Sequence, residues 1–190
     1  SLDVLDSHPA FLIDFTLPEG TLAAAKWSAA RGVPMVSGVT GLSVKVTEAL
    51  ESASTSVPVL WSPNLSIGVN LLADLAGRAG QVLDNDVSVA IEDIHHQWKK
   101  DAPSGTALML GERVARGRGG DPARIEYSSV REGEVIGEHT VRFTMDGEEF
   151  ELVHRAHNRK IYALGAISAG KWLMNQPPGL YSAADWLAGI

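Results

Sequence analysis

The sequence predicts an α/β protein that combines part of an open parallel sheet with a second, α+β portion built on a mixed open sheet. Three observations support this prediction. In the first third of the 190 residues, short apolar runs alternate with helix-like stretches. The hydrophobic pattern changes at residue 66, and a two-residue turn signal, Asp146-Gly147, then lies between two long strand-like stretches.

The first third reads as strand, helix, strand, helix, strand. The apolar runs at 11–15, 34–36 and 58–61 are too short for helices, and the stretches 20–30 and 43–53 between them have helical spacing. This βαβαβ order predicts a parallel sheet. Ligands bind at the carboxyl ends of parallel strands, so we expect the loops 14–16, 38–41 and 62–66 to line one crevice, although each could be a simple turn.

The middle of the chain predicts two helices and a sheet with one buried face. A helix follows residue 66, a strand runs through 87–91 into a pair of histidines, and a second helix covers 105–115. Strands are expected at 125–131, 138–145 and 148–156. The Asp146-Gly147 turn fixes the register, so that one face pairs Met145 with Glu148, Phe143 with Phe150, Val141 with Leu152 and His139 with His154, and the other face pairs Arg142 with Glu151.

The His139–His154 pair could indicate a metal or proton site. We instead expect two stacked histidines at a sheet or subunit surface, because no carboxylate on the same face is placed to complete a ligand set.

The last part of the chain predicts a helix at 160–174, a turn at 177–179 and a short helix at 183–190. We expect it to pack back on the first portion. The predicted domains are therefore 1–65 with 160–190, and 66–159.

Composition narrows the function. A net charge of -7 leaves no basic stripe for nucleic acid, and no run is apolar enough to span a membrane. The absence of cysteine excludes disulfides and thiolate chemistry. We expect a cytoplasmic protein that acts on small molecules.

The informative segment runs from His95 to Ala107, after a strand and into a helix. Ser104 can cap that helix, and the amides of Gly105 and Thr106 would then face an anion such as a carboxylate, although a plain cap is the alternative. His95, His96 and Lys99 could supply protons or positive charge, although paired histidines also occur in ordinary loops.

This segment, read as His-His-Gln-Trp-Lys-Lys-Asp-Ala-Pro-Ser-Gly-Thr-Ala, resembles that of the dihydrodipicolinate (4-hydroxy-tetrahydrodipicolinate) reductases of bacterial lysine and diaminopimelate synthesis. The resemblance covers essentially the whole chain. It is carried also by residues 14–20, 38–41, 62–70, 131–140 and 179–181.

The resemblance implies hydride transfer from NADH or NADPH to a cyclic, unsaturated dicarboxylate imine, which gives tetrahydrodipicolinate. It implies that His95 donates or accepts the proton and that Lys99 is the second catalytic residue. His96, Gly105 and Thr106 match substrate-binding positions, and we expect Ser104 to join them. The expected cofactor contacts are Phe15, Thr16, Gly38, Val39, Thr40, Ser62, Pro63, Asn64 and Leu65, and no metal is expected.

Further implications concern the rest of the protein. By the same resemblance, the chain is partly a Rossmann-type domain, and an exposed apolar face of the second domain's sheet assembles a homotetramer. The family's glycine-rich phosphate loop is not in this sequence, so we expect the N-terminal part of the dinucleotide-binding domain to be missing. Arg159 is expected to form a structural ion pair, with a carboxylate ligand as the alternative. The sequence differs from the family's more common residues at Val39, Ser62 and Trp98.

Two other functions compete with the reductase. One is a catalytically silent module that binds a dicarboxylate or drives oligomerisation. The other, a histidine-based metal hydrolase, is disfavoured because the His95-His96 region lacks the helical spacing and the carboxylate of a metal site.

Overall fold

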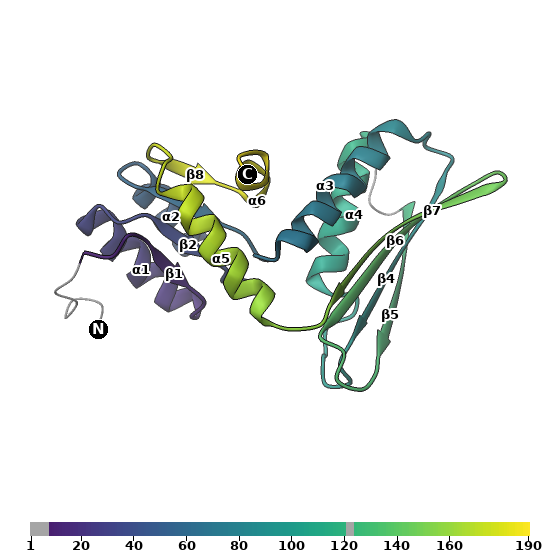
Figure 1. Ribbon diagram of the computed structural model, residues 1–190, viewed down its shortest axis with the longest axis horizontal. Coiled ribbons are helices and arrows are strands. Elements are labelled where there is room, and N and C mark those ends of the chain that lie inside the picture. Colours follow the sequence, from purple (N-terminus) through teal and green to yellow (C-terminus); the bar gives the residue numbers. More distant parts are fainter. Residues whose placement is uncertain (1–7, 121–123) are drawn as a thin grey trace. The chain divides into compact units, whose positions relative to one another are not determined.

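The computed structural model describes residues 8–120 and 124–190, and these residues form two compact units (Figure 1). The first unit comprises the described residues up to Ile67 together with Tyr162–Ile190. The second unit is Gly68–Ile161. Each unit contains one four-stranded sheet among the described residues.

The sheet of the first unit is wholly parallel, in the strand order β1-β2-β3-β8. Its strands are β1 (Leu12–Asp14), β2 (Met35–Ser37), β3 (Pro58–Trp61) and β8 (Gly179–Tyr181). The register places Asp14 beside Ser37 and Ser37 beside Trp61, so the loops after these three strands start at one edge of the sheet. This confirms the predicted βαβαβ order.

Both faces of this sheet are covered by helices. Met35 and Val59 face a core with α1 (Pro18–Arg31) and α2 (Val44–Ser54), while Val36 and Leu60 face a core with α5 (Lys160–Leu173) and α6 (Ala183–Ala188). Burial on both sides explains why these strands are continuous apolar runs rather than alternating ones. The C-terminal helices therefore pack on the first portion of the chain, as the sequence predicted.

Strand β8 was not predicted, because residues 177–179 were read as a turn. It pairs in parallel with β3 through Pro58–Gly179, Val59–Leu180 and Leu60–Tyr181. A three-residue strand directly after two prolines has no detectable alternation, so only its packing partner reveals it.

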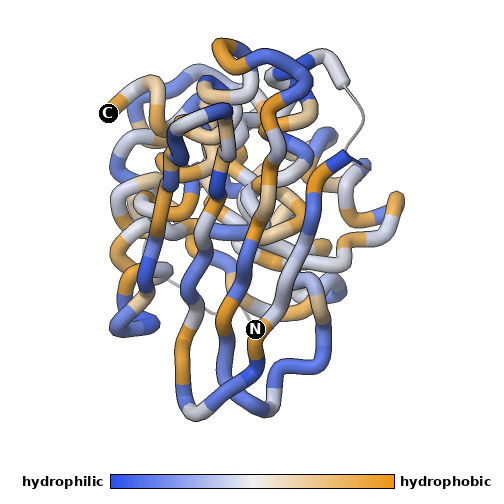
Figure 2. Tube along the Cα trace, turned by 90° about the vertical axis from the view of Figure 1, so that its right-hand side faces the viewer, coloured by the Kyte–Doolittle hydropathy of each residue, from blue (hydrophilic) through white to orange (hydrophobic). Residues whose placement is uncertain are grey.

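The second unit contains a mixed sheet in the strand order β5-β4-β6-β7. The central strand β4 (Ser88–His95) is parallel to β5 (Ile125–Arg131) and antiparallel to β6 (Gly137–Met145), which pairs with β7 (Glu148–Ala156). The hairpin has the predicted register throughout, and Gly147 adopts a φ of 82° in its turn. Figure 2 shows hydrophobic and hydrophilic residues following one another along these strands.

Helices α3 (Ile67–Val82) and α4 (Gly105–Arg118) cover one face of this sheet. Leu72, Ala76, Leu110 and Val114 pack there against inward-facing strand residues such as Ile91, Val141 and Phe143. The opposite face is mixed, and the predicted pair of Arg142 with Glu151 lies on it. It carries ion pairs of Arg142 with Glu151 at 2.6 Å and of Arg155 with Glu138 at 3.0 Å, besides Val153.

A glycine in α5 lets this helix approach the loop after β3. A Cβ atom at Gly165 would collide with the carbonyl oxygen of Leu65, a backbone atom that no rotamer change can move away. Alanine normally stabilises a helix interior by about 1 kcal/mol over glycine. Here the collision outweighs that gain, because overpacking in a filled core costs about 1–3 kcal/mol.

We therefore expect Gly165→Ala to lower the free energy of unfolding by about 1–2 kcal/mol, measured by urea denaturation followed by circular dichroism. Ser168→Ala, which puts the same residue one turn further along α5, is the control and should change little. Equal stability of both variants and the unsubstituted chain would show that the loop after β3 shifts to accommodate the added methyl group.

Candidate active site

The loops at the carboxyl edge of the first sheet are held by a buried carboxylate. Asp14 is 2% exposed and ends β1. It accepts hydrogen bonds from the Thr16 amide at 3.0 Å and the Thr16 hydroxyl at 2.6 Å. The hydroxyls of Thr21 and Ser37 also donate to it, at 2.7 and 3.0 Å. One side chain thus links the loop after β1, helix α1 and the end of β2.

The residues expected to contact the cofactor follow these three strand ends. Gly38 donates from its amide to the Asp14 carbonyl at 2.9 Å, and the Val39 carbonyl accepts from the Trp61 indole at 2.8 Å. In the loop after β3, the Ser62 hydroxyl donates to the Asn64 carbonyl at 2.7 Å. The positions expected from the sequence all lie on these loops: Phe15, Thr16, Gly38, Val39, Thr40, Ser62, Pro63, Asn64 and Leu65.

This edge fits a nicotinamide cofactor. Phe15 is 51% exposed, and its ring lies so near Gly38 that a Cβ atom at residue 38 would collide with it. An exposed aromatic ring beside a residue without a side chain offers a flat, apolar surface for the ring of a dinucleotide.

In the second unit, helix α4 begins at the segment that carries the chemistry. Ser104 is the N-cap, and its hydroxyl accepts from the Ala107 amide at 3.2 Å. A Cβ atom built on Gly105 would meet no atom within 4 Å. The first turn of α4 therefore has room for an anion beside its amides, where the helix dipole favours negative charge.

The end of β4 carries a buried carboxylate that sequence reasoning missed. Asp93 is fully buried, and its Oδ1 accepts from His95 Nδ1 at 2.9 Å and from Arg131 Nη1 at 2.8 Å. Its Oδ2 accepts from the Ser104 amide at 3.1 Å and the Ser129 hydroxyl at 2.6 Å. These four hydrogen bonds outweigh the burial that opposes ionisation, and they hold the pKa of Asp93 below its ordinary value.

His95 has one engaged and one available ring nitrogen. A carboxylate only accepts hydrogen bonds, so Nδ1 carries the hydrogen that Asp93 receives, and Nε2 is left for proton exchange. A Cβ atom at Gly137 would lie 3.1 Å from Nε2, so glycine keeps space open beside this atom. Burial lowers the pKa of His95, although the hydrogen bond and charge of Asp93 oppose this effect.

Lys99 is connected to the same network. Its Nζ pairs with the Asp101 carboxylate at 2.8 Å, and the Asp101 carbonyl accepts from Arg131 Nη2 at 2.6 Å. Since Arg131 also bonds Asp93, it joins the histidine at the end of β4 to the loop that carries the lysine.

His139 and His154 are neighbours as predicted, with ring centroids 6.4 Å apart, but they are not a surface pair. His139 is 4% exposed and packs edge-on against His95 at 5.1 Å, with its Nε2 3.4 Å from the Ser104 hydroxyl. The expectation that no carboxylate shares their face was also wrong, because Asp93 lies directly across from His139. Within residues 8–120 and 124–190, no group of three or more histidine, cysteine, aspartate or glutamate side chains could hold a metal ion.

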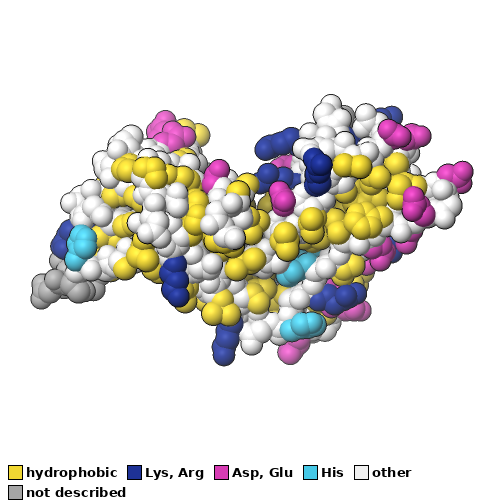
Figure 3. All heavy atoms as spheres, turned by 45° about the horizontal axis from the view of Figure 1, so that its top comes forward, with side chains coloured by type: hydrophobic (Ala, Val, Ile, Leu, Met, Phe, Trp, Pro, Cys, Tyr) yellow, Lys and Arg dark blue, Asp and Glu magenta, His cyan; other side chains and the backbone are white. Residues whose placement is uncertain are grey.

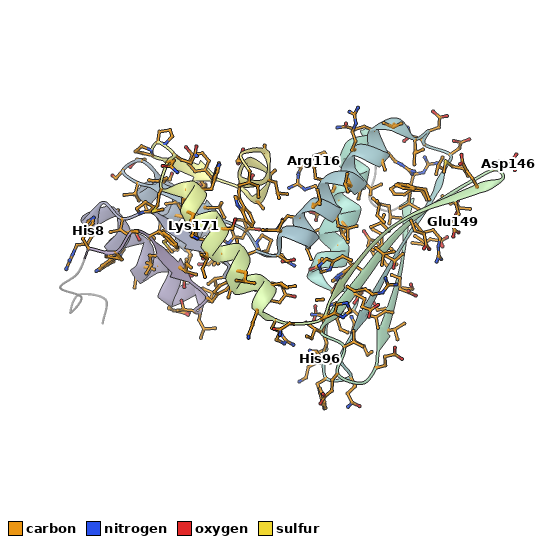
Figure 4. All side chains as sticks on the ribbon, in the orientation of Figure 1. His8, His96, Arg116, Asp146, Glu149 and Lys171 are labelled. Carbon is orange, nitrogen blue, oxygen red and sulfur yellow. The ribbon has the colours of Figure 1, made fainter. Side chains whose placement is uncertain are left out.

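His96 lines an open, shallow pocket of about 250 Å³, together with Trp98, Glu134, Ile136 and Arg159. The His96 Nδ1 atom is buried and has no hydrogen-bond partner among the described residues. Arg159 forms no ion pair with any acidic residue that the structure describes, so the predicted structural pair is not seen among these residues. Figure 4 shows His96 at the end of the sheet opposite the hairpin tip that carries Asp146.

The functional segment of the second unit is thus a histidine and a lysine beside a helix N-terminus; buried contacts of Asp93 hold the histidine and the helix start, and a partly exposed ion pair with Asp101 holds the lysine. Figure 3 shows histidine and basic side chains near one another on the surface of this part of the molecule. Together with a parallel sheet whose loops suit a dinucleotide, these features define a two-unit α/β oxidoreductase. No helix that the structure describes is both long and apolar enough to cross a membrane.

Comparison with known proteins identifies the family. Residues 1–65 match the model described as dihydrodipicolinate reductase, N-terminus, and residues 68–187 match dihydrodipicolinate reductase, C-terminus. The 4-hydroxy-tetrahydrodipicolinate reductase of Stenotrophomonas maltophilia is 46% identical over 96% of this chain and 75% of its own length. That of Magnetococcus marinus is 41% identical over 93% of this chain and 72% of its own length.

A solved structure is also similar: the dipicolinate-bound dihydrodipicolinate reductase from Paenisporosarcina sp. TG-14 has a TM-score of 0.80 and 25% sequence identity. The match covers 92% of this chain and 72% of the Paenisporosarcina chain. The chain belongs to the dihydrodipicolinate reductase family.

The buried His139 should make folding sensitive to acid. Burial, aided by the nearby His95, lowers the pKa of His139 to about 3, whereas the unfolded value is 6.5. Between these values the unfolded chain binds the additional proton, so stability is complete above pH 6.5 and declines as the pH falls towards 3. For one such histidine the decline is about 2 kcal/mol between pH 7 and pH 5.

We expect His139→Gln to flatten the pH dependence of the unfolding free energy by about this amount, as measured by urea denaturation at each pH. His157→Gln, which replaces an exposed histidine, is the control. The same slope in His139→Gln and in the unsubstituted chain would show that His139 is protonated in the folded state.

Proposed function

We propose that this chain catalyses the NADH- or NADPH-dependent reduction of 4-hydroxy-tetrahydrodipicolinate (dihydrodipicolinate) to tetrahydrodipicolinate in lysine and diaminopimelate biosynthesis. One observation carries the proposal. His95, with Nε2 available, is held by the same buried carboxylate that receives the amide of Ser104, the N-cap of α4. A proton donor and an anion-binding helix end are thereby fixed to each other, as a dicarboxylate substrate requires.

The two domains have different proposed roles. We assign residues 1–65 and 160–190 to the dinucleotide-binding domain and residues 66–159 to the substrate-binding and tetramerisation domain. The loops that end β1, β2 and β3 would hold the cofactor, through the exposed ring of Phe15, the small Gly38 and backbone groups of 38–40 and 62–65. When bound, this cofactor supplies a hydride.

The chain's own residues hold the substrate and supply the proton. One carboxylate of the substrate is received by the amides of Gly105 and Thr106, with the Ser104 cap beside them. The second carboxylate is received by the pocket that His96 and Arg159 line, where the Arg159 guanidinium, which has no ion pair with a described acidic residue, favours an anion.

His95 gives its proton from Nε2, and Nδ1 stays bonded to Asp93 throughout. Burial lowers the pKa of His95, which makes its charged form a stronger acid. Lys99 contributes a positive charge, and a substrate carboxylate can replace the half-exposed Asp101 as its partner. The 4-hydroxyl group of the substrate leaves as water, which gives the dihydrodipicolinate form, and hydride and proton together then saturate one of its double bonds.

The protein is proposed to act in the cytoplasm as a homotetramer. The face of the second sheet opposite α3 and α4 offers Val153, which is 40% exposed, between charged residues that can pair across subunits. Its mixed character agrees better with a regular assembly surface than with a general hydrophobic patch.

The reaction is tested by following nicotinamide absorbance while the substrate is generated in a coupled assay, with NADH and NADPH in separate runs. We expect turnover that falls on the order of a hundredfold or more in His95→Gln and in Lys99→Ala. Lys100→Ala removes an adjacent, exposed lysine and should retain activity. If the chain stays silent also when a complete dinucleotide-binding domain is supplied, it is the non-catalytic binding module instead.

Substrate binding can be measured apart from turnover with dipicolinate, the ligand of the similar Paenisporosarcina protein. We expect Arg159→Met to weaken dipicolinate binding about tenfold in calorimetry, since a charged hydrogen bond contributes about 1.5–3 kcal/mol. Arg78→Met removes an exposed arginine of α3 as the control. Unchanged affinity in Arg159→Met would place the second carboxylate elsewhere.

A further inference from the structure

We infer that Asp93 is a positioning residue for proton transfer: its carboxylate fixes the ring orientation of His95 and dictates which ring nitrogen exchanges the proton. The inference rests on the proposed function for its catalytic consequence. Its structural content, the control of His95 by Asp93, can be measured without turnover.

The carboxylate is fixed from three directions. His95 lies two residues further along β4, Ser129 and Arg131 lie on the neighbouring β5, and the Ser104 amide starts α4. Each carboxylate oxygen receives two of these groups at 2.6–3.1 Å. Rotation of the carboxylate would break several hydrogen bonds in a buried place, so the acceptor for His95 stays where it is.

A fixed acceptor determines the state of the histidine. Because Oδ1 can only accept, it selects the tautomer with hydrogen on Nδ1 and leaves Nε2 as the nitrogen that gains or loses a proton. Nε2 is also the atom beside Gly137, where the missing side chain leaves space. If Asp93 only capped α4, the hydrogen bond from the Ser104 amide to Oδ2 would be enough. The second oxygen would then have no need to be directed at His95.

The other charged and titratable groups that face His95 oppose Asp93. Arg131 on β5 and Lys99 on the following loop are cations that disfavour the charged imidazole, and His139 on β6 packs against its ring. Asp93 is the anion among these neighbours that favours protonated His95. The charge of Asp93 therefore maintains the protonated form of His95, and the position of Asp93 orients the imidazole ring.

The test is a titration of His95 by NMR on the full chain with labelled histidine, with the His95 signal assigned by its absence in His95→Gln. In Asp93→Asn we expect the pKa of His95 to fall by about one unit, because an opposite charge within hydrogen-bond distance is lost. In Arg131→Gln we expect the pKa to rise, since a repelling cation is removed. The control, Asp74→Asn, removes an exposed carboxylate of α3 and should leave the titration unchanged.

Kinetics supply the second readout. A histidine that acts as an acid loses activity as the pH rises through its pKa, so Asp93→Asn should move the alkaline limb of kcat/KM to lower pH by the same amount. It should also lower kcat on the order of tenfold at pH 8. Arg131→Gln should move the limb in the opposite direction. A merely structural role would lower activity at all pH values without moving the limb.

An unchanged His95 titration in a folded Asp93→Asn variant, checked by circular dichroism, would overturn the inference. If Asp93→Asn does not fold, Arg131→Gln decides, and the absence of an upward shift there overturns the inference. If the expected NMR shift is seen in a chain that has no reductase turnover, the positioning of His95 by Asp93 is supported. The proposed reaction is then the part that is overturned.

Discussion

A buried carboxylate at the end of a strand is the constraint on which the candidate site depends. Asp93 sits in the face of β4 that packs against helices, where an isolated charge would be costly. Four hydrogen-bond donors offset that cost, and they come from the strand itself, the next strand and the start of α4. Because all of them must be in place together, the positions of these elements are specified by one another.

The first unit uses the same device. Asp14 ends β1, is buried, and collects hydroxyls from the following loop, from α1 and from the end of β2. In both units the carboxylate lies where a strand gives way to a functional loop, so backbone that would otherwise be free to move is tied to the sheet. Exposed surfaces such as the Phe15 ring are thereby presented on rigid supports, which lowers the cost of binding.

Elements with strong local signals could be predicted from the sequence, and elements defined by distant partners could not. The Asp146-Gly147 turn determined the register from Met145 to His139, because a two-residue loop leaves no alternative pairing. Strand β8 has no such signal and exists through its pairing with β3. Resemblance to a family supplied the expected roles of His95 and Lys99, but it was silent on what holds them.

The network around Asp93 was missed even though a signal was present. Val89, Ile91, Asp93 and His95 alternate along β4, so the two polar residues fall on the buried face, where a charge demands partners. Reading that pattern would have identified Asp93 as important without naming Ser129 or Arg131, which lie 36 and 38 residues away in sequence. His139 was predicted at the surface because its pairing with β4 was not considered, although it lies across from Asp93 in the core.

The place of Arg131 in the sheet has a consequence for how the protein would lose activity. Arg131 is the last residue of β5, which is an edge strand, and edges open by local fluctuation before a sheet unfolds as a whole. When that strand end detaches, Asp93 loses a partner and the loop carrying Lys99 loses its anchor at the Asp101 carbonyl in the same event. We therefore expect mild warming or low denaturant to reduce catalysis in molecules whose helices and remaining strands are intact, before the fold is lost as a whole.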